Sequence, residues 1–277
     1  AFSTGIGSTE AASAMAFGKL WFKMPETQKF VVDGKPGKYV MGKDIILHII
    51  GSIGVDGALY KSMEFYGSAV KLLSLADRIS IANMAVEAGA KTGIIPPDKK
   101  VFEYLKGRVR GKYKPIYADK NAEYVETFTY KAGEILCTVA KPFLPSNIAP
   151  AKELGSIVID QAYLGSCTNG RIEDLRIAAR ILKGRKVHRN VRMIVVPASK
   201  AVFEQALKEG LIKIFMDANL RRMLGRLHGR ACRRRALHLL DKSKLRWAHG
   251  AQGKRGLSCE SCGCCSECGE GEDNGSE

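Results

Sequence analysis

Short apolar runs with strand-like spacing alternate with helical patterns along the first 218 residues of the chain. The run KFVVD at 29–33 predicts a strand, followed by a turn containing Gly and Pro and a second short strand ending at Val40. The clearest helical pattern begins at Ser74, a residue type that caps helices, and stops at Gly89. Another strand is expected within ALYKSMEFYG, 58–67.

The stretch SIVIDQAYLGSCTNGR, 156–171, reads as an apolar strand that runs into a polar loop. An amphipathic helix is expected over 172–184, a buried strand over 191–199 and a further helix from Lys200. The repeated order of strand, loop and helix predicts a mostly parallel α/β layer. After residue 218 this periodicity ends.

Length and composition are those of a soluble globular protein of about two domains. The chain has 277 residues, of which 45% are hydrophobic and 26% are charged. No apolar run approaches the roughly 20 residues that a membrane span needs, so no membrane partner is expected. The net charge of +16 would suit nucleic acid, but the charges of the first 218 residues are interspersed, as on a solvated surface. We therefore predict no nucleic-acid partner.

The eight cysteines are distributed unevenly. Only Cys137 and Cys167 precede residue 219. Two cysteines do not make a disulfide framework, so this distribution indicates a reducing, cytoplasmic setting. Most of the others crowd near the end without an intervening core, unlike the separated ligand pairs of zinc sites. They are Cys259, Cys262, Cys264, Cys265 and Cys268.

The loop YLGSCTNGR, 163–171, carries the most concentrated candidate chemistry. It offers the thiol of Cys167, the hydroxyl of Ser166 and the amide of Asn169, just before a helix N-terminus that favours anions. The Cys167 thiolate could ligate a metal or act as a nucleophile. The alternative is a buried structural cysteine in a tight turn. Cys137 has strand-like surroundings and is expected to be a small hydrophobe.

Glu64 is the second candidate, because it is an acid within a predicted strand and lies close to Gly67. One interpretation is an ordinary solvated strand residue. The other is a carboxylate at a strand end beside a cleft, where it could exchange protons with a substrate.

Seven segments of the chain, taken together, carry motifs that can be compared with known proteins. They are AFSTGIGSTE, GKLWFKMPET, KDIILHIIGSIGVDGA, MEFYGSA, ISIANMAVEAGAKTGIIPPD, IDQAYLGSCTNGRIEDLRIAARILKGRKVH and VPASKAVFEQALKEGLI. The set covers nearly all of residues 1–218 and resembles the large subunits of 3-isopropylmalate dehydratases, in the aconitase superfamily. Large subunits of homoaconitase and other aconitase-type hydro-lyases share these motifs and are the close alternative.

The resemblance implies an α/β fold with aconitase-like α/β/α layered domains and mostly parallel sheets, incomplete in this chain. A remnant of a first domain is expected over 1–27 and a second domain over 28–148. The start of a third, cluster-bearing domain is expected over 149–218. Residues 219–277 are expected to be an out-of-frame, disordered tail.

The resemblance also implies a [4Fe-4S] hydro-lyase that interconverts 2-isopropylmalate and 3-isopropylmalate by dehydration and rehydration in leucine biosynthesis. Cys167 would be a metal ligand of the cluster, and Glu64 would be catalytic, handling the hydroxyl or water that leaves and returns. Ser166 and Asn169 would bind substrate. A small subunit would complete a hetero-oligomer.

The chain departs from the family at both ends. The family carries a Gly-Asp-Ser-His-Thr motif upstream, and a CxxC pair and an Asn-Arg-Asn-Phe motif downstream. Read one base later, permitted codons for 228–250 spell MGVLADGERCISSTNRNFVGRMG, which contains the second motif. We therefore expect an N-terminally truncated chain, frameshifted after about residue 218 and inactive as written. A competing hypothesis, based only on the tail, is a Cys-rich metal-binding module with a basic nucleic-acid-binding arm.

Overall fold

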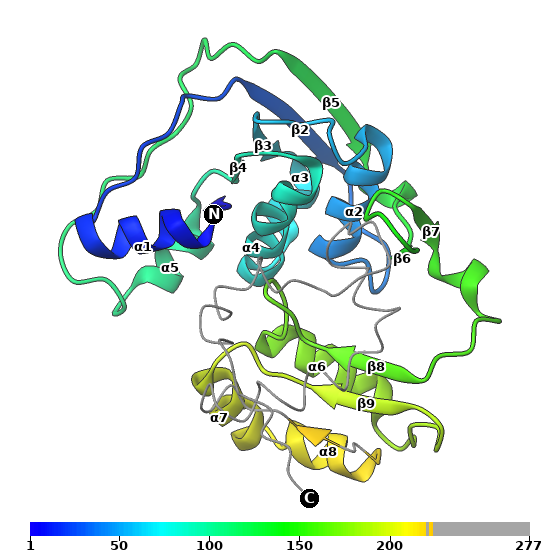
Figure 1. Ribbon diagram of the computed structural model, residues 1–277. Coiled ribbons are helices and arrows are strands. Elements are labelled where there is room, and N and C mark those ends of the chain that lie inside the picture. Colours follow the sequence, from blue (N-terminus) through cyan, green and yellow to red (C-terminus); the bar gives the residue numbers. More distant parts are fainter. Residues whose placement is uncertain (220–221, 224–277) are drawn as a thin grey trace, which may run out of the picture. The chain divides into compact units, whose positions relative to one another are not determined.

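The computed structural model describes residues 1–219 and 222–223 (Figure 1). Its described residues divide into two compact units, with Gly5–Met24 separate from Ala1–Thr4 and the chain from Pro25 onward. The expected tail therefore lies outside the described residues, except for Asn219 and Arg222–Met223. The cysteines and basic arm of the competing hypothesis also lie outside them.

A five-stranded sheet is the framework of the larger unit, with the strand order β1-β4-β3-β2-β5. Four neighbouring strands are parallel, and β1 pairs antiparallel with β4 at one edge. The strands are β1 (Phe2–Thr4), β2 (Thr27–Asp33), β3 (Ser62–Tyr66), β4 (Thr92–Ile94) and β5 (Glu126–Lys131). Since parallel strands need crossovers, helices separate most of them along the chain.

Three helices cover one face of this sheet: α2 (Gly42–Ile53), α3 (Ser68–Leu72) and α4 (Leu75–Met84) (Figure 1). Alternate residues of β2 and β3, such as Phe30 and Phe65, pack with the isoleucines of α2 in one hydrophobic core. The predicted helix start is confirmed, because Ser74 Oγ accepts the N–H of Asp77 at 3.0 Å. The predicted stop is confirmed by Gly89, which ends the following 3₁₀ turn (Ala85–Ala88) in the left-handed conformation.

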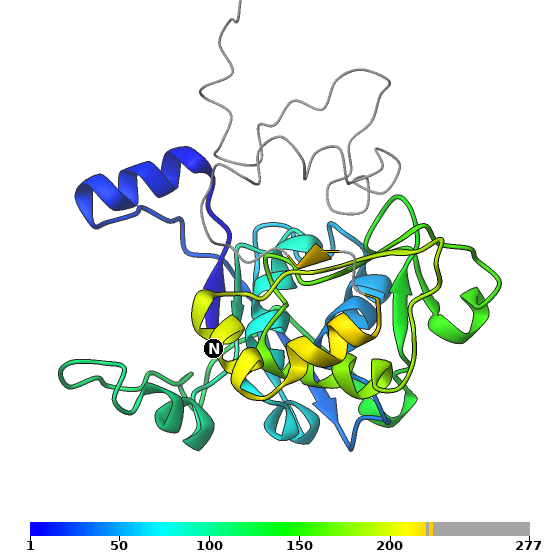
Figure 2. The same cartoon turned by 90° about the horizontal axis from the view of Figure 1, so that it is seen from below.

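A second sheet contains the three parallel strands β8 (Gln161–Leu164), β9 (Arg192–Val195) and β10 (Arg222–Met223), in the order β10-β9-β8. Its helices are α6 (Ile172–Leu182), α7 (Lys200–Lys208) and α8 (Leu211–Asp217). Figure 2 shows the yellow helices α7 and α8 beside the same sheet. Leu175, Val195 and Phe215 are fully buried in the core that these elements share.

The remaining elements are short. They are α1 (Ser8–Phe17), α5 (Lys99–Leu105), β6 (Thr138–Ala140), β7 (Ile148–Pro150) and the 3₁₀ turns Ala132–Glu134 and Ala151–Leu154. The polar segment between α5 and β5 has no regular secondary structure, and we call residues 106–125 the connector.

The α/β fold class with mostly parallel sheets is confirmed. The predicted second strand ending at Val40 is wrong. Tyr39 has a φ of 68°, and Val40 N donates to Gly37 O at 3.2 Å, so this segment forms a turn. The domain boundaries given above stay predictions. In the described part of the chain, no helix is both long and apolar enough to cross a membrane.

Candidate active site

The loop of residues 165–171 joins β8 to α6, and two glycines determine its path. Gly165 and Gly170 have φ angles of 126° and 84°, which L side chains rarely adopt. A Cβ at Gly165 would collide with the carbonyl oxygen of Val196, and one at Gly170 would lie 2.6 Å from the same atom. Ala198 N also donates to Gly170 O at 2.7 Å. The loop therefore lies tightly against the chain that follows β9.

Asp174, in the first turn of α6, anchors the same loop from the other side. Its side chain is buried, and Oδ2 accepts the N–H groups of Gly170 at 2.8 Å and Arg171 at 3.0 Å. The Asn169 amide reaches the same oxygen at 3.4 Å. A carboxylate at this position satisfies backbone donors that helix formation leaves unpaired, and it suits the helix dipole.

Ser166 and Asn169, both predicted to bind substrate, take part in the internal hydrogen bonds of the loop. Ser166 Oγ accepts the N–H groups of Thr168 at 3.2 Å and Asn169 at 3.0 Å. The Thr168 hydroxyl donates to the Asn169 amide oxygen at 2.9 Å. These contacts shape the turn around residue 167 and use part of the capacity of both side chains. Their substrate role stays a prediction.

Cys167 is exposed at the middle of this turn. The alternative of a buried structural cysteine is therefore wrong, because the thiol faces solvent. Among the described residues, no group of three or more His, Cys, Asp or Glu side chains is placed to hold a metal ion. Cys137 is half-buried, with its Sγ 3.9 Å from the carbonyl oxygen of Lys38.

Ser80 links helix α4 to the cysteine loop. Its side chain is 1% exposed, and Oγ donates to the carbonyl oxygen of Thr168, next to Cys167, at 3.2 Å. A buried hydroxyl in a helix would otherwise be costly, so this bond both satisfies Ser80 and fixes the loop.

Glu64 is 7% exposed, so the interpretation as a solvated strand residue is wrong. It lies on β3, where Oε1 accepts the hydroxyl of Tyr66 at 2.7 Å and Oε2 accepts that of Tyr124 at 3.0 Å. Burial raises the pKa of Tyr66, as do its bonds to Tyr124 and Glu64, so this phenol keeps its proton at neutral pH. The carboxylate thus has two neutral donors.

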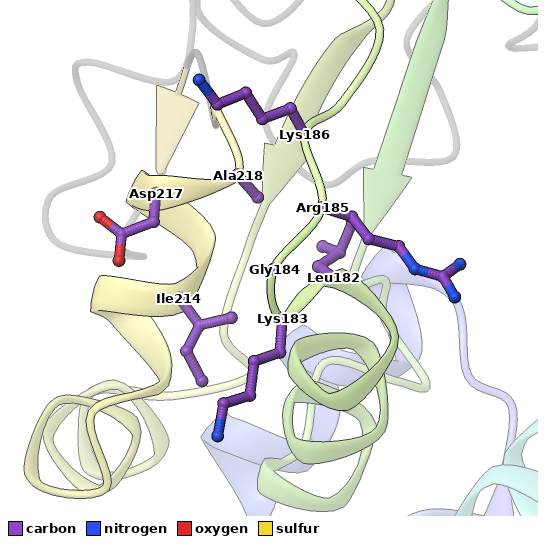
Figure 3. Close-up of a pocket in the computed structure, with 8 residues that line it drawn as sticks. All are labelled: Leu182, Lys183, Gly184, Arg185, Lys186, Ile214, Asp217 and Ala218. Carbon is purple, nitrogen blue, oxygen red and sulfur yellow. The ribbon is translucent and has the colours of Figure 1, made fainter.

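A small pocket of about 300 Å³ lies between the end of α6 and the end of α8 (Figure 3). Ile214 and Asp217 line it from α8, and 182–186 line it from the other side. In Figure 3 the long side chains of Lys183, Arg185 and Lys186 point in different directions, so their charges do not converge on one ligand. The candidate residues Glu64 and Cys167 do not line this pocket.

The family model described as "Aconitase family (aconitate hydratase)" matches residues 1–156 and 146–224. The chain belongs to the aconitase family. This membership confirms the resemblance inferred from the sequence motifs.

Curated relatives named "3-isopropylmalate dehydratase large subunit" match this aconitase-family chain over 79% of its length. That of Acetivibrio thermocellus is 59% identical over 218 residues, with 52% of the relative covered. That of Hydrogenobaculum sp. is 57% identical over 218 residues, with 51% covered. That of Aquifex aeolicus is 55% identical over 223 residues, with 52% covered. The chain therefore spans about half the length of the curated relatives it matches.

Sequence patterns indicated only some of the residues that contact Glu64 and the cysteine loop. Tyr66 follows Glu64 by two residues and therefore shares its strand face, a signal that the pattern contained. Asp174, three residues after Arg171, was recognisable as a helix-capping acid. Tyr124 and Ser80 were not recognisable, because only the folded path of the chain brings them to Glu64 and to the cysteine loop.

Proposed function

We propose that this chain is part of the large subunit of a [4Fe-4S] hydro-lyase. The enzyme would interconvert 2-isopropylmalate and 3-isopropylmalate by dehydration and rehydration in leucine biosynthesis. The supporting observation is the 55–59% identity to relatives named as large subunits of 3-isopropylmalate dehydratase, over 218 to 223 residues and 79% of this chain. The name of these relatives supports a small subunit as partner in a hetero-oligomer, for which we propose a cytoplasmic location.

The described residues meet one requirement for binding the [4Fe-4S] cluster. An exposed thiolate held in a rigid turn is a suitable iron ligand, and Cys167 provides it. A cubane needs several cysteine ligands, and the described residues place one thiol in this loop. When bound, the cluster would supply a Lewis acid for the hydroxyl that leaves.

The polypeptide's own groups would supply proton handling and orientation. Glu64 would donate a proton to the hydroxyl as it leaves as water, and would take a proton back from the water that re-enters. Ser166 and Asn169 would donate hydrogen bonds to the substrate beside Cys167. Ser166 is next to Cys167, and Asn169 is two residues after it in the same tight turn. A small dicarboxylate could therefore contact all three side chains.

Iron binding tests the role of Cys167. After anaerobic reconstitution with iron and sulfide, we expect Cys167→Ser to lose most of the bound iron and of the visible cluster absorbance. Cys137→Ser is the matched control, because this half-buried thiol lies in another part of the chain, and it should retain both. Equal iron content in the two variants would contradict the assignment.

Substrate turnover tests the reaction and the role of Glu64. In the cluster-loaded large subunit mixed with its small subunit, Glu64→Gln should lower kcat by about 10²- to 10⁴-fold, since it removes a general base while keeping the size of the side chain. Glu123→Gln, at an exposed acid of the connector, should retain activity. Comparing isopropylmalate with homoaconitate separates the two aconitase-type alternatives. Unchanged turnover in Glu64→Gln would refute the role.

A further inference from the structure

The strand pairing places a polar group of side chains on the sheet face that points away from the helical core. Met63 and Phe65 enter the core, so Glu64 and Tyr66 between and beyond them face the other way. The β2–β3 register places Lys29 directly opposite Glu64. Cross-strand neighbours of opposite charge attract one another. Glu64 therefore belongs to a polar group whose side chains come from both β2 and β3.

Each oxygen of the Glu64 carboxylate has its own phenol donor. Tyr66 OH binds Oε1 at 2.7 Å, and Tyr124 OH binds Oε2 at 3.0 Å. The two phenol oxygens are 3.3 Å apart. Donors on both oxygens prevent the carboxylate from rotating. Tyr124 comes from the connector, which otherwise consists almost entirely of exposed residues.

Lys29 holds the two aromatic rings. Its Nζ lies 5.1 Å from the centroid of the Tyr66 ring and 5.0 Å from that of the Tyr124 ring. An ammonium within about 6 Å of a ring centroid is attracted to the ring face. One cation therefore contacts both rings whose hydroxyls bind Glu64.

We propose that Tyr66, Tyr124 and Lys29 are positioning residues that hold the Glu64 carboxylate in one orientation for proton transfer. This inference rests on the proposed function, because it specifies how the proposed base is held. Burial raises the pKa of both phenols, with Glu64 contributing in the same direction, so they remain donors across the neutral range. The connector would thus act on Glu64 through one hydroxyl.

The test removes one donor at a time. Tyr66→Phe and Tyr124→Phe keep the rings and lose the hydroxyls. Tyr130→Phe is the matched control, since its hydroxyl binds Ser52 at 2.7 Å and makes no bond to Glu64. Lys29→Met removes the cation but keeps an apolar stem. In this chain, the ¹³C NMR signal of the Glu64 carboxyl is recorded at neutral pH, with its assignment taken from Glu64→Gln.

We expect the Glu64 carboxyl signal to shift in Tyr66→Phe, Tyr124→Phe and Lys29→Met, because each lost partner changes the hydrogen bonding or orientation of the carboxylate, and to stay unchanged in Tyr130→Phe. In the loaded enzyme, kcat should fall severalfold in the same three variants while KM changes little, because proton transfer is misdirected and substrate binding is kept. An unmoved carboxyl signal together with an unchanged kcat in both Tyr66→Phe and Tyr124→Phe would overturn the inference.

The activity readout separates this inference from the proposed function. If Glu64→Gln retains full turnover, the proposed base is wrong, and the positioning role fails with it. If Glu64→Gln loses turnover but kcat is unchanged in both tyrosine variants, only the positioning role fails.

Discussion

At the scale of single residues, the two main candidates differ in how the fold presents them. Cys167 is exposed at the tip of a turn that hydrogen bonds and two left-handed glycines hold in shape. Glu64 is buried, and both of its oxygens have donors. An exposed thiol can bind a metal or react, whereas a buried and paired carboxylate has a fixed direction.

Thiol alkylation should distinguish the described cysteines. Because Cys167 is exposed and Cys137 is only partly accessible, iodoacetamide should label Cys167 severalfold faster. Peptide mass spectrometry over a time course measures both rates in one sample, and denatured protein gives the reference with equal access. Faster labelling of Cys137 would contradict the described loop.

Replacing Asp174 should destabilise the cysteine loop. Asp174→Ala leaves the N–H groups of Gly170 and Arg171 without their acceptor, which should cost about 2 kcal/mol in the free energy of unfolding. Glu173→Ala, at the preceding acidic residue of the same helical turn, should cost about 0.5 kcal/mol or less. Urea unfolding measures both values. Similar losses in the two variants would argue against Asp174 as the anchor.

At the scale of secondary-structure elements, Arg78 joins three helices. It is 1% exposed on α4 and donates to the carbonyl oxygens of Val70 and Lys71 at 3.1 and 2.9 Å, in α3. It also pairs at 2.8 Å with Asp98, which caps α5 through the N–H of Lys100. A buried guanidinium needs such partners, because an unpaired charge is costly in the interior.

The Arg78–Asp98 pair should make stability depend on pH. Burial alone would raise the pKa of Asp98. The Arg78 guanidinium and the backbone N–H groups of Lys100 and Val101 outweigh this effect and lower the pKa. The stabilisation is therefore present above the unfolded-state pKa and is lost as pH falls through the lower folded-state value. Asp98→Asn should lose about 2 kcal/mol at pH 7, less than a fully buried pair would, because Asp98 is partly exposed.

Unfolding titrations of both proteins from neutral to acid pH provide the measurement. The difference between the unfolding free energies of wild type and Asp98→Asn should start to narrow near the ordinary Asp pKa of about 4 and disappear at lower pH, once folded Asp98 is protonated and neutral like asparagine. A difference that is independent of pH would show that the charge of Asp98 does not stabilise the fold.

At the scale of the whole molecule, the described residues contain two separate hydrophobic cores. One lies between the five-stranded sheet and α2–α4, with Phe30 at its centre. The other is formed by β9 with α6, α7 and α8, with Phe215 fully buried. Each core is made of its own elements, so each can lose packing without the other.

Hydrogen exchange should reveal the two cores as separate units. Phe30→Ala should cost about 3 to 5 kcal/mol and reduce amide protection in β2, β3 and β5, with little change in α6 and α8. Phe215→Ala should have the reverse pattern. Equal loss of protection across both cores in either variant would show that they unfold as one.

The sequence by itself determined strands β2, β3, β8 and β9, both ends of the helical segment from Ser74 to Gly89, the parallel α/β class, the family and the prominence of Cys167. These features depend on local patterns: apolar period, Ser74 and Gly89 at helix ends, and motifs that stay contiguous in the chain. The turn at Tyr39 was missed, because a left-handed residue leaves little trace in an apolar pattern.

Tertiary structure alone decided the surroundings of the candidates. It buried Glu64, exposed Cys167 and brought Tyr124 to a carboxylate 60 residues earlier in the chain. It also joined Ser80 to Thr168 across 88 residues. The physical reason is that burial and hydrogen-bond partners depend on which strands pair and which loops cross them. These are long-range contacts, whereas periodicity reports only on neighbours within a few residues.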